Sequence, residues 1–594
     1  MRVDPVTLEV IRNRLDTIAA EMQTTLLHSA YSVILKEGED CSAALFNHRG
    51  EIIAQSCALP QHMGAFIPAI QRMMEAFPPS TVHERDVYTM NDPHDGGTHL
   101  PDLIIVLPVV FEAELVGFSA TLAHQEDFGG KVPGSMPADS TEIFQEGLIL
   151  PPLKLYDRGV PNQTLLALIR RNVRIPHVVL GDISAQVAAG TTGKNRLVEL
   201  FHRYGKAMTQ RYMDHLLDHA EVLTRKRIEA IPDGTYTFTD YMDNDGIDLE
   251  QRVPITATVT VAGSDITVDF TGTSRQVKGP INAPWSGASS SVFYAVRTIT
   301  DPTIPDNHGC YRPIRVILPE GSLVKPHHPA PVAIRAHTLK RIADVVLGAL
   351  VKALPAQLPA ANSGSISVVS FGGVDPATGR QFGLSDIVSG GMGGRPTKDG
   401  VEVVDTDVSN CMNIPAEAIE MHYPLRVLQY TLRQDAAGSG RFRGGTGVVR
   451  VCQVTRGEVT CSYRSERHYT PAWGLFGGLP SATWQTYIVR RSGEVETVPS
   501  KRVFTLQEGD ALHVYAGGGG GYGDPLLRQA ERVVEDVLDG KLSIEDARKD
   551  YGVVIDPITK TVDEQHTEEV RAQHRVQRGK ICWTYDRGET LGKE

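Results

Sequence analysis

The chain has 594 residues and a formal net charge of −12 at neutral pH, a length that implies about three to five structural units rather than one compact core. The acidic balance, without a dense block of lysine and arginine, argues against nucleic acid as a partner, and no apolar run approaches the roughly 20 residues that span a bilayer. The seven cysteines include no Cys-x-x-Cys pair, and the N-terminus lacks the apolar region of a signal peptide. We therefore expect reduced thiols and a cytoplasmic protein.

An amphipathic helix is predicted at the start of the chain. Asp4 and Pro5 are typical of an N-cap followed by proline in the first helical turn. Apolar residues then recur every three or four positions from Leu8 to Leu26, which is the spacing of one buried helix face.

A short hairpin is predicted next, with strands at 42–46 and 51–54 on either side of a turn. Asp40 stands at the mouth of this hairpin, either as a metal ligand or as a plain cap of the strand end. Its neighbour Cys41 would need a nearby base and a lowered pKa to act as a nucleophile. We interpret Cys41 as a small buried filler, because free cysteine tends to be buried.

Metal-binding side chains gather around the following hairpin. Two apolar runs of strand length occupy 103–111 and 115–123. Because the first strand of an antiparallel pair begins beside the end of the second, Asp102 and His124 should meet at one end of the sheet. His99 lies three residues before Asp102, on a loop that its glycines and proline force to turn sharply. These three side chains can therefore converge.

Imidazole and carboxylate ligands together suit Zn, Fe(II) or Mn, and two of each leave room for water on an ion that accepts five or six ligands. For any single one of these residues, a polar cap on a strand end is the simpler interpretation. The convergence of the whole set favours a metal site that acts on a small substrate.

A long irregular segment follows at 127–152 and is dense in glycine, proline and acidic residues. Such a segment inside a folded domain more often serves function than not, so we expect it to shape a pocket. The candidate pocket residues are His94, Phe128, Lys131 and Ser135, and a packing role for each is equally open.

The rest of the chain shows both helical and β patterns. Helices are predicted at 165–174, 181–212, 289–299 and 339–354, and strands at 236–241, 253–261 and 266–270. Glycine-rich turns recur, and the run 517–521 indicates a tight turn or a boundary.

We expect a mixed α+β fold with several lobes. A metal-bearing N-terminal α/β region is assigned to 1–230, a β-rich region with helices to 231–525, and a mostly helical or extended tail to 526–594. No nucleotide-binding motif is found: the stretch Gly190 to Asn195 lacks the spacing and the Ser/Thr of a Walker A motif. If ATP is used, the sequence gives no sign that this chain binds it.

Several motifs together carry a resemblance to a known family. They are Asp40-Cys41-Ser42, Asn91-Asp92-Pro93, Gly96 to Asp102, His124 with Asp127 and Gly129-Gly130, Pro133-Gly134-Ser135, Gln145-Glu146-Gly147, Asn172-Val173-Arg174, Gly181-Asp182 with Ala185-Gln186, Arg441 to Gly445, and Gly521 to Pro525. On these residues the chain resembles, over nearly its whole length, the hydantoinase B/oxoprolinase family. That family includes the smaller subunits of ATP-dependent hydantoinases, oxoprolinases and caprolactamase, and related subunits of acetone and acetophenone carboxylases.

The resemblance implies an enzyme of two subunits, arranged as an α2β2 heterotetramer. A larger hydantoinase A-type subunit, an actin-like kinase, would use ATP and Mg to phosphorylate the carbonyl oxygen of a hydantoin, 5-oxoproline or lactam. This chain would supply metal-bound hydroxide to hydrolyse the activated ring. The ligands that the family pattern assigns to the metal are Asp40, His99, Asp102 and His124.

Two positions depart from the family pattern: Gln125 stands where relatives often have histidine, and His94 stands where tyrosine is usual. The proton for the departing nitrogen would come through one of three carboxylates, namely Asp127, Glu126 or Glu146.

Two other functions stay open. The first is a subunit of an acetone- or acetophenone-type carboxylase, although the length of the chain is closer to that of the hydantoinase-type subunit. The second is a noncatalytic scaffold that docks a kinase partner, against which the retention of all four ligand types argues.

Overall fold

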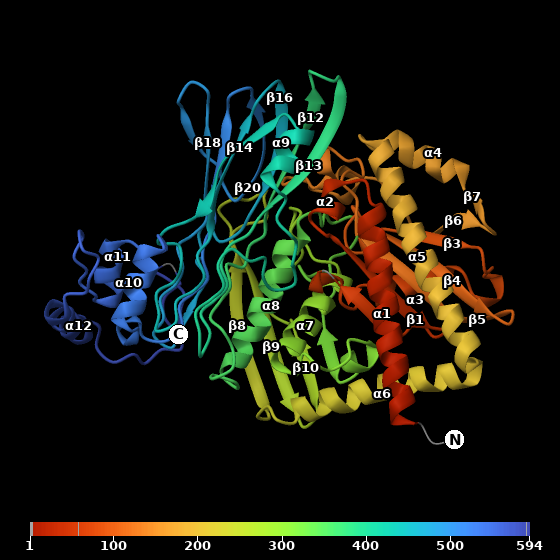
Figure 1. Ribbon diagram of the computed structural model, residues 1–594, viewed down its shortest axis with the longest axis horizontal. Helices are drawn as coiled ribbons and strands as arrows, with labels where there is room; N and C mark the ends of the chain where they lie inside the picture. Colours follow the sequence, from red (N-terminus) through yellow and green to blue (C-terminus); the bar gives the residue numbers. More distant parts are fainter. Residues whose placement is uncertain (1–3, 58, 590) are drawn as a thin grey trace.

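The computed structural model describes residues 4–57, 59–589 and 591–594, and it has the mixed α+β architecture that the sequence predicts (Figure 1). The strands of the described residues form sheets of seven, five, four, four and two strands. Within that part of the chain, no helix is both long and apolar enough to cross a membrane.

The seven-stranded sheet positions the N-terminal region. Its strand order is β2 (Ile52–Cys57), β1 (Cys41–Asn47), β5 (Glu114–His124), β4 (Asp102–Phe111), β3 (Val87–Met90), β6 (Leu153–Asp157) and β7 (Val160–Pro161). Side chains alternate between its faces, so that Leu45 packs with α1 (Pro5–Ser29) and α5 (Pro176–Tyr204), whereas Phe46 packs with α3 (Phe66–Ala76). Figure 1 shows α1 and α5 crossing this sheet on one side.

The predicted helices are confirmed with one exception. Helix α1 begins as expected, because the Asp4 carboxylate accepts a hydrogen bond of 2.8 Å from the amide of Thr7. The single helix predicted at 181–212 is wrong. Helix α5 ends at Tyr204 and α6 (Lys206–Ile228) begins after Gly205, whose φ of 76° and ψ of 156° break the helical path. Both helices bury apolar side chains, so the apolar period continues across the break.

The middle of the chain begins with a four-stranded sheet in the order β11 (Ile314–Ile317), β10 (Asp265–Asp269), β9 (Val253–Ala262) and β8 (Gly234–Met242). It confirms the three strands predicted there. The predicted helices are also confirmed as α7 (Trp285–Ile299) and α8 (Arg335–Val351), and α8 packs against β8 and β9. Helix α8 is buried along almost its entire length, which makes it the central helix of the molecule.

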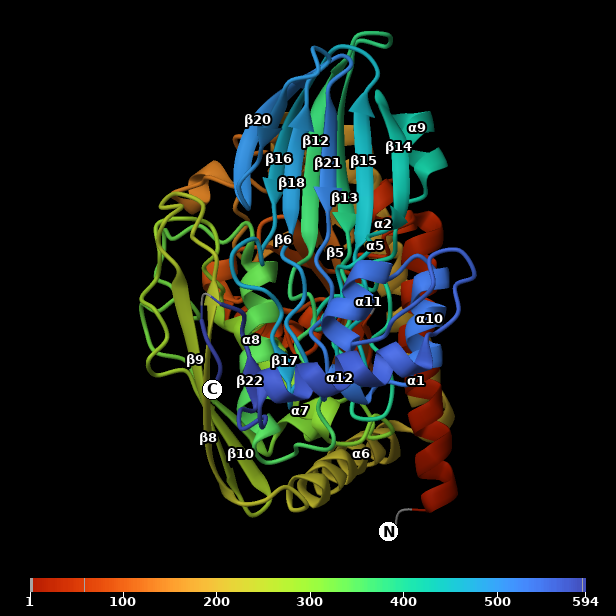
Figure 2. The ribbon, with the colours of Figure 1, turned by 90° about the vertical axis from the view of Figure 1, so that its left-hand side faces the viewer.

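The β-rich upper part of Figure 2 is a sandwich of two antiparallel sheets. One sheet has the order β13 (Arg380–Val388), β12 (Ser367–Asp375), β16 (Glu458–Arg464) and β20 (Lys501–Gln507). The other has the order β14 (Leu425–Leu432), β15 (Val448–Val454), β21 (Ala511–Tyr515), β18 (Gln485–Val489) and β19 (Val495–Thr497). Val369, Phe371 and Tyr463 point into the core between the sheets.

Short elements complete the fold. They are α2 (Val33–Lys36), α4 (Gln163–Asn172), α9 (Ala416–His422), the pair β17 (Gly474–Leu475) and β22 (Tyr585–Asp586), and the C-terminal helices α10 (Ala530–Leu538), α11 (Ile544–Tyr551) and α12 (Glu564–Arg578). Figure 1 shows the three C-terminal helices gathered on the side opposite α4 and α5.

The glycine run 517–521, where the sequence indicates a tight turn or a boundary, is a buried crossing of chain segments. The amide of Gly520 donates to the carbonyl of Ala361 at 2.8 Å, and the amide of Gly519 donates to the carbonyl of Gly445 at 3.0 Å. A Cβ atom added at Gly519 would stand 2.1 Å from the carbonyl oxygen of Met392. Glycine is therefore required because backbones approach each other too closely for any side chain.

Gly117 in β5 offers a test of how tightly the N-terminal sheet is packed. A Cβ atom at this position would lie 2.3 Å from the carbonyl oxygen of Phe46 in β1, so Gly117→Ala must push the two strands apart and should destabilise the protein by about 1–3 kcal/mol. We expect a clearly lower apparent melting temperature by differential scanning fluorimetry. The control is Gly383→Ala in β13, where the nearest atom is 3.9 Å away. Equal melting temperatures for the two variants would contradict the packing described here.

Candidate metal centre

Three neighbouring strand ends build the site. Strand β4 begins at Asp102 and β5 ends at His124, and these two residues are directly paired. The amide of His124 donates to the carbonyl of Asp40 at 3.1 Å, just before β1 begins. The predicted hairpins are thus confirmed, and they place the side chains of Asp40, Asp102 and His124 at the same edge of the sheet.

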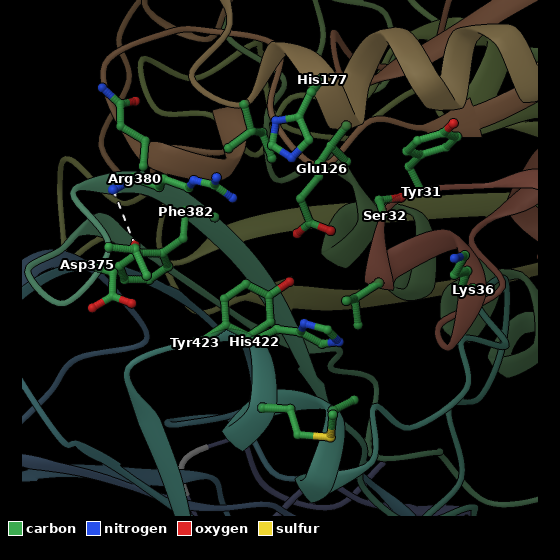
Figure 3. A pocket seen from close by; sticks show the side chains of 18 of the residues that line it. Tyr31, Ser32, Lys36, Glu126, His177, Asp375, Arg380, Phe382, His422 and Tyr423 are labelled. Atoms are coloured by element: carbon green, nitrogen blue, oxygen red, sulfur yellow. Dashed lines mark hydrogen bonds between the residues drawn. The ribbon is translucent and has the colours of Figure 1, made fainter.

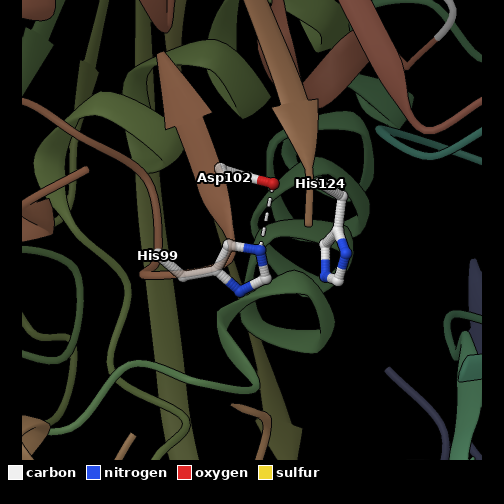
Figure 4. Close-up of side chains that lie close together, drawn as sticks. All are labelled: His99, Asp102 and His124. Atoms are coloured by element: carbon white, nitrogen blue, oxygen red, sulfur yellow. Dashed lines mark ion pairs between the residues drawn. The ribbon is translucent and has the colours of Figure 1, made fainter. Parts of the chain in front are cut away.

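The loop before β4 brings His99 to the same edge. Its Nε2 lies 3.1 Å from Oδ1 of Asp102, and its ring centre lies 5.1 Å from that of His124. Figure 4 shows the three side chains converging. Each of the three side chains has a nitrogen or oxygen atom within 4.8 Å of such atoms of the other two. This is close enough for a single ion to bind all three.

His62 is a fifth candidate ligand, and the sequence analysis missed it. One atom each from Asp40, His62 and Asp102 also lie within 4.8 Å of one another. The Nε2 atom of His62 is 4.0 Å from Oδ1 of Asp40 and 4.0 Å from Oδ2 of Asp102. His62 ends the short 3₁₀ helix Pro60–His62 after β2, and β2 ends beside the start of β1. His62 therefore lies just beyond the same sheet edge as Asp40 and His124.

The buried polar atoms of this cluster lack partners. Among the described residues, Oδ1 of Asp40, Nε2 of His62 and Nδ1 of His124 are buried without a hydrogen bond, although unpaired buried polar atoms are costly. The Nδ1 atom of His62 is hydrogen-bonded to Oγ of Ser42 at 2.9 Å, which orients the ring with its other nitrogen toward the carboxylates. A set of oriented, unpaired nitrogen and oxygen donors fits a transition metal ion.

The two aspartates are held in different electrostatic states. Burial disfavours the charged form of Asp102, yet its interactions with His99 and with the positive charge of Arg335 hold the pKa of Asp102 well below its usual value. One oxygen of Asp102 accepts hydrogen bonds from Arg335 and from the hydroxyl of Thr98. Burial, and then the charge of Asp102, raise the pKa of Asp40 well above its usual value. Asp40 is thus the carboxylate that most needs a neighbouring cation.

The histidines are neutral in this environment. Burial lowers the pKa of His62 to about 4 and that of His124 to about 3, and it also lowers the pKa of His99. At neutral pH each ring therefore keeps a free lone pair, which is the form that binds metals.

Three of the five candidate ligands, Asp40, His99 and His124, line a small cavity of about 40 Å³. Its polar wall includes Asp40, His99, His124 and Arg335, and its apolar wall includes Ile34 and Ile387. A space of this size accommodates an ion with water but no larger molecule.

Three residues of the segment 127–147 were predicted to line a pocket, and none of them lines this cavity. Phe128 is fully buried in an apolar cluster with Leu103 and Leu150. The Ser135 hydroxyl donates to the carbonyl of Gly129 at 2.7 Å, and Lys131 forms an ion pair with Asp139 at 2.9 Å. These contacts fix the loop itself.

The two departures from the family pattern, His94 and Gln125, are not among the residues that line the cavity. His94 lies between the carbonyl of Ala330, 2.9 Å from its Nε2, and the ring of His328. The Gln125 amide donates to the side-chain oxygen of Gln186 in α5 at 3.1 Å.

The three carboxylates considered for proton transfer have different surroundings. Asp127 forms an ion pair with Arg174 at 3.0 Å and accepts hydrogen bonds from loop amides. Glu146 accepts hydrogen bonds from the amides of Val332 and Ala333, and burial raises its pKa to about 7. The carbonyl of Ala333 lies 3.4 Å from Nδ1 of His99, so Glu146 supports the backbone beside a candidate ligand.

Glu126 lies between the cavity and a larger pocket of about 510 Å³. Its carboxylate accepts hydrogen bonds from the amides of Ile34 and Ser385, and both of those residues line the cavity. Figure 3 shows the carboxylate directed into the larger pocket, near Tyr423 and His177. Burial raises the pKa of Glu126 to about 8, so it carries a proton at neutral pH.

Cys41 is fully buried, and burial raises the pKa of its thiol well above the usual value. This confirms the expectation that it fills space. A buried thiol that resists ionisation is a poor nucleophile.

Comparisons with known proteins relate the whole chain to one family. The family model described as hydantoinase B/oxoprolinase matches residues 4–525. A Pseudomonas protein named as one subunit of a putative D-/L-hydantoinase is 36% identical over 588 residues, covering 96% of this chain and 98% of that protein.

Two solved structures are similar in fold. The crystal structure of an ATP-dependent caprolactamase from Pseudomonas jessenii matches with a TM-score of 0.88 and 30% identity, covering 96% of this chain and 100% of that one. The nucleotide-free structure of an acetone carboxylase matches with a TM-score of 0.90 and 21% identity, covering 97% of this chain and 83% of that one. At that identity the second likeness concerns the fold alone.

His62 provides a test of the ligand set, because no motif pointed to it. If His62 is a ligand, His62→Gln should lower the metal content of the purified chain severalfold, measured by inductively coupled plasma mass spectrometry after dialysis. The matched control is His219→Gln on the exposed side of α6, which should keep the metal content of the unaltered protein. Unchanged metal in a folded His62→Gln variant would remove His62 from the ligand set.

Proposed function

The chain belongs to the hydantoinase B/oxoprolinase family, and from this premise we propose that it is the metal-binding subunit of an ATP-dependent cyclic amidase. The observation that carries the proposal is the convergence of unpaired, buried nitrogen and oxygen donors at one sheet edge. Its substrate would be the cyclic amide of a hydantoin, 5-oxoproline or lactam, activated by a partner before it reaches this site.

The residues that would hold the ion share burial and converging donor atoms. They are Asp40, His62, His99, Asp102 and His124. Three imidazoles with two carboxylates suit Zn, Fe(II) or Mn. When bound, such an ion supplies Lewis acidity, which acidifies water and stabilises negative charge on oxygen.

The surrounding residues position these ligands. Arg335 and Thr98 hold one oxygen of Asp102, which leaves the other directed at His99. Ser42 fixes the ring of His62. The apolar side chains of Ile34, Ile366 and Ile387 exclude bulk water from the cavity, so that charges inside it interact strongly.

Activation by a partner accounts for the use of ATP. An amide resists hydrolysis because resonance protects its carbonyl and makes nitrogen a poor leaving group, and phosphorylation of the oxygen removes much of that protection. The similar caprolactamase is ATP-dependent by its name, and the similar hydantoinase and caprolactamase chains are named as subunits. We assign ATP and Mg to a larger hydantoinase A-type kinase subunit, in an α2β2 assembly with this chain.

We assign the proton transfer to the departing nitrogen to Glu126. It is protonated near neutral pH, and it contacts the backbone of two residues that line the cavity. Of the three carboxylates, only Glu126 lines the larger pocket; Asp127 is paired with Arg174, and Glu146 accepts hydrogen bonds from the amides beside His99. Those two carboxylates therefore support the architecture of the loop and of the ligand shell.

The proposed activity is tested by co-expressing the chain with the proposed hydantoinase A-type kinase subunit. The purified complex is then assayed for ATP-dependent ring opening on a panel of lactams and hydantoins. His99→Ala should lower turnover at least about 100-fold, because a ligand that orients Asp102 is lost, and it should also lower bound metal. His566→Ala, at an exposed position of α12, is the control. Full activity of His99→Ala at normal metal content would refute the assignment, and product formed without ATP would refute the activation scheme.

The proton-transfer role is tested separately with Glu126→Gln in the same complex. General acid catalysis contributes about 10²–10⁴-fold, so kcat should fall by a factor in that range while the metal content stays constant. Glu37→Gln, an exposed residue at the rim of the same pocket, should change kcat less than twofold. An unchanged kcat in Glu126→Gln would assign the proton to another group.

A carboxylase remains the second candidate because the fold is shared with acetone carboxylase. The same complex distinguishes the two activities. Turnover of a ketone that requires bicarbonate, without hydrolysis of any cyclic amide, would replace the amidase proposal.

A further inference from the structure

One face of the sandwich sheet β13–β12–β16 borders the metal cavity. Side chains alternate along these strands, and the face opposite the sandwich core contributes Ile387, Ser385 and Val368 to the cavity wall. In the register of the sheet, Val368 is paired with Arg464 of β16. Paired residues of antiparallel strands point to the same face, so Arg464 projects from the cavity face, one strand beyond Val368.

Arg464 is a buried cation without a counter-ion. It is 1% exposed, and in the described part of the chain its side-chain partners are the carbonyl of Met136 and the hydroxyls of Ser370 and Ser462. None of these carries a charge. The other fully buried arginines each form an ion pair with an aspartate: Arg335, Arg341, Arg450 and Arg467. Burying an uncompensated guanidinium is strongly unfavourable.

A second unpaired side chain lies beside residues of α8 that line the same cavity. His337, in the first turns of α8, is 1% exposed, and neither of its ring nitrogens has a hydrogen-bond partner among the described residues. The two residues before it, Arg335 and Ala336, line the metal cavity. Lys501 in β20 is the register partner of Arg464 and is neutralised by Glu466. No described carboxylate pairs with Arg464 itself.

Arg464 is also close to the metal cavity. The carbonyl that accepts its hydrogen bond belongs to Met136, which lines the cavity. A group bound at Arg464 would therefore lie beside a reacting centre at the metal ligands.

We propose that Arg464 and His337, with the hydroxyl of Ser370, form an oxyanion-binding subsite beside the metal cavity. The subsite takes the phosphoryl group of an activated substrate. A guanidinium offers paired N–H donors that match the oxygens of a phosphoryl group, and a neutral imidazole adds one more donor. The backbone carbonyl of Met136 now occupies one of the guanidinium donors, and a phosphoryl oxygen would take its place.

The existence of an anion site is inferred only from these buried hydrogen-bond donors. The identity of the anion as a phosphoryl group rests on the proposed function. A carboxylate on the substrate would use the same donors. The two sources are distinguished by comparing inorganic phosphate with acetate, because they differ in geometry and charge.

The test is isothermal titration calorimetry of the metal-free full-length chain with inorganic phosphate and, separately, with acetate at equal ionic strength. Metal is removed because phosphate also binds metal ions. The unaltered chain should bind phosphate, and Arg464→Gln should weaken that binding at least tenfold. Arg464→Lys, which keeps the charge, should weaken it less. Arg450→Gln removes a buried arginine that is paired with Asp386, and it should leave phosphate affinity within about twofold.

The melting temperature of each variant shows whether it folds. If Arg464→Gln does not fold, His337→Phe replaces it in the titration, and we expect His337→Phe to weaken phosphate binding severalfold. Absence of phosphate binding by the unaltered chain, or equal affinity in the folded variants, would overturn the anion site. Tighter binding of acetate than of phosphate would overturn the phosphoryl assignment. None of these measurements requires ATP, the partner or turnover, so they stand even if the amidase assay fails.

Discussion

Two carboxylates buried side by side impose the main constraint on this structure. Asp40 and Asp102 come from the starts of different strands, and each lies 4.0 Å from the same nitrogen of His62. Two negative charges at such a separation, away from water, repel each other strongly. Arg335 compensates one of them by pairing with Asp102. The second charge needs another cation, and the neutral imidazoles around it are donors that a metal ion would bind.

This constraint explains why the site is assembled from distant parts of the chain. The ligands lie on the edge of the N-terminal sheet, the compensating arginine begins the central helix α8, and the remaining wall comes from the sandwich. Each part alone would leave buried polar groups unpaired. The site therefore depends on the three parts packing together, and the buried face of α8 supports that packing.

Part of this arrangement could be predicted from local patterns. Apolar runs of strand length fixed the hairpin of β4 and β5, and antiparallel pairing then placed Asp102 against His124. His62 escaped prediction because it follows β2 in a short 3₁₀ turn with no apolar pattern of its own. Arg335 and Arg464 lie more than 200 residues beyond the first ligands, and only tertiary packing brings them near. The helix break at Gly205 was missed because the apolar period continues on both sides of it.

We propose that one ion binds among Asp40, His62, His99, Asp102 and His124. The most direct measurement is anomalous X-ray diffraction from crystals of an active preparation, with data collected above and below the absorption edge of the metal found in it. We predict a single anomalous peak, about 2.0–2.3 Å from nitrogen and oxygen atoms of these side chains. Crystals of active protein with no peak at this cluster, or with the peak at a different set of residues, would contradict the claim.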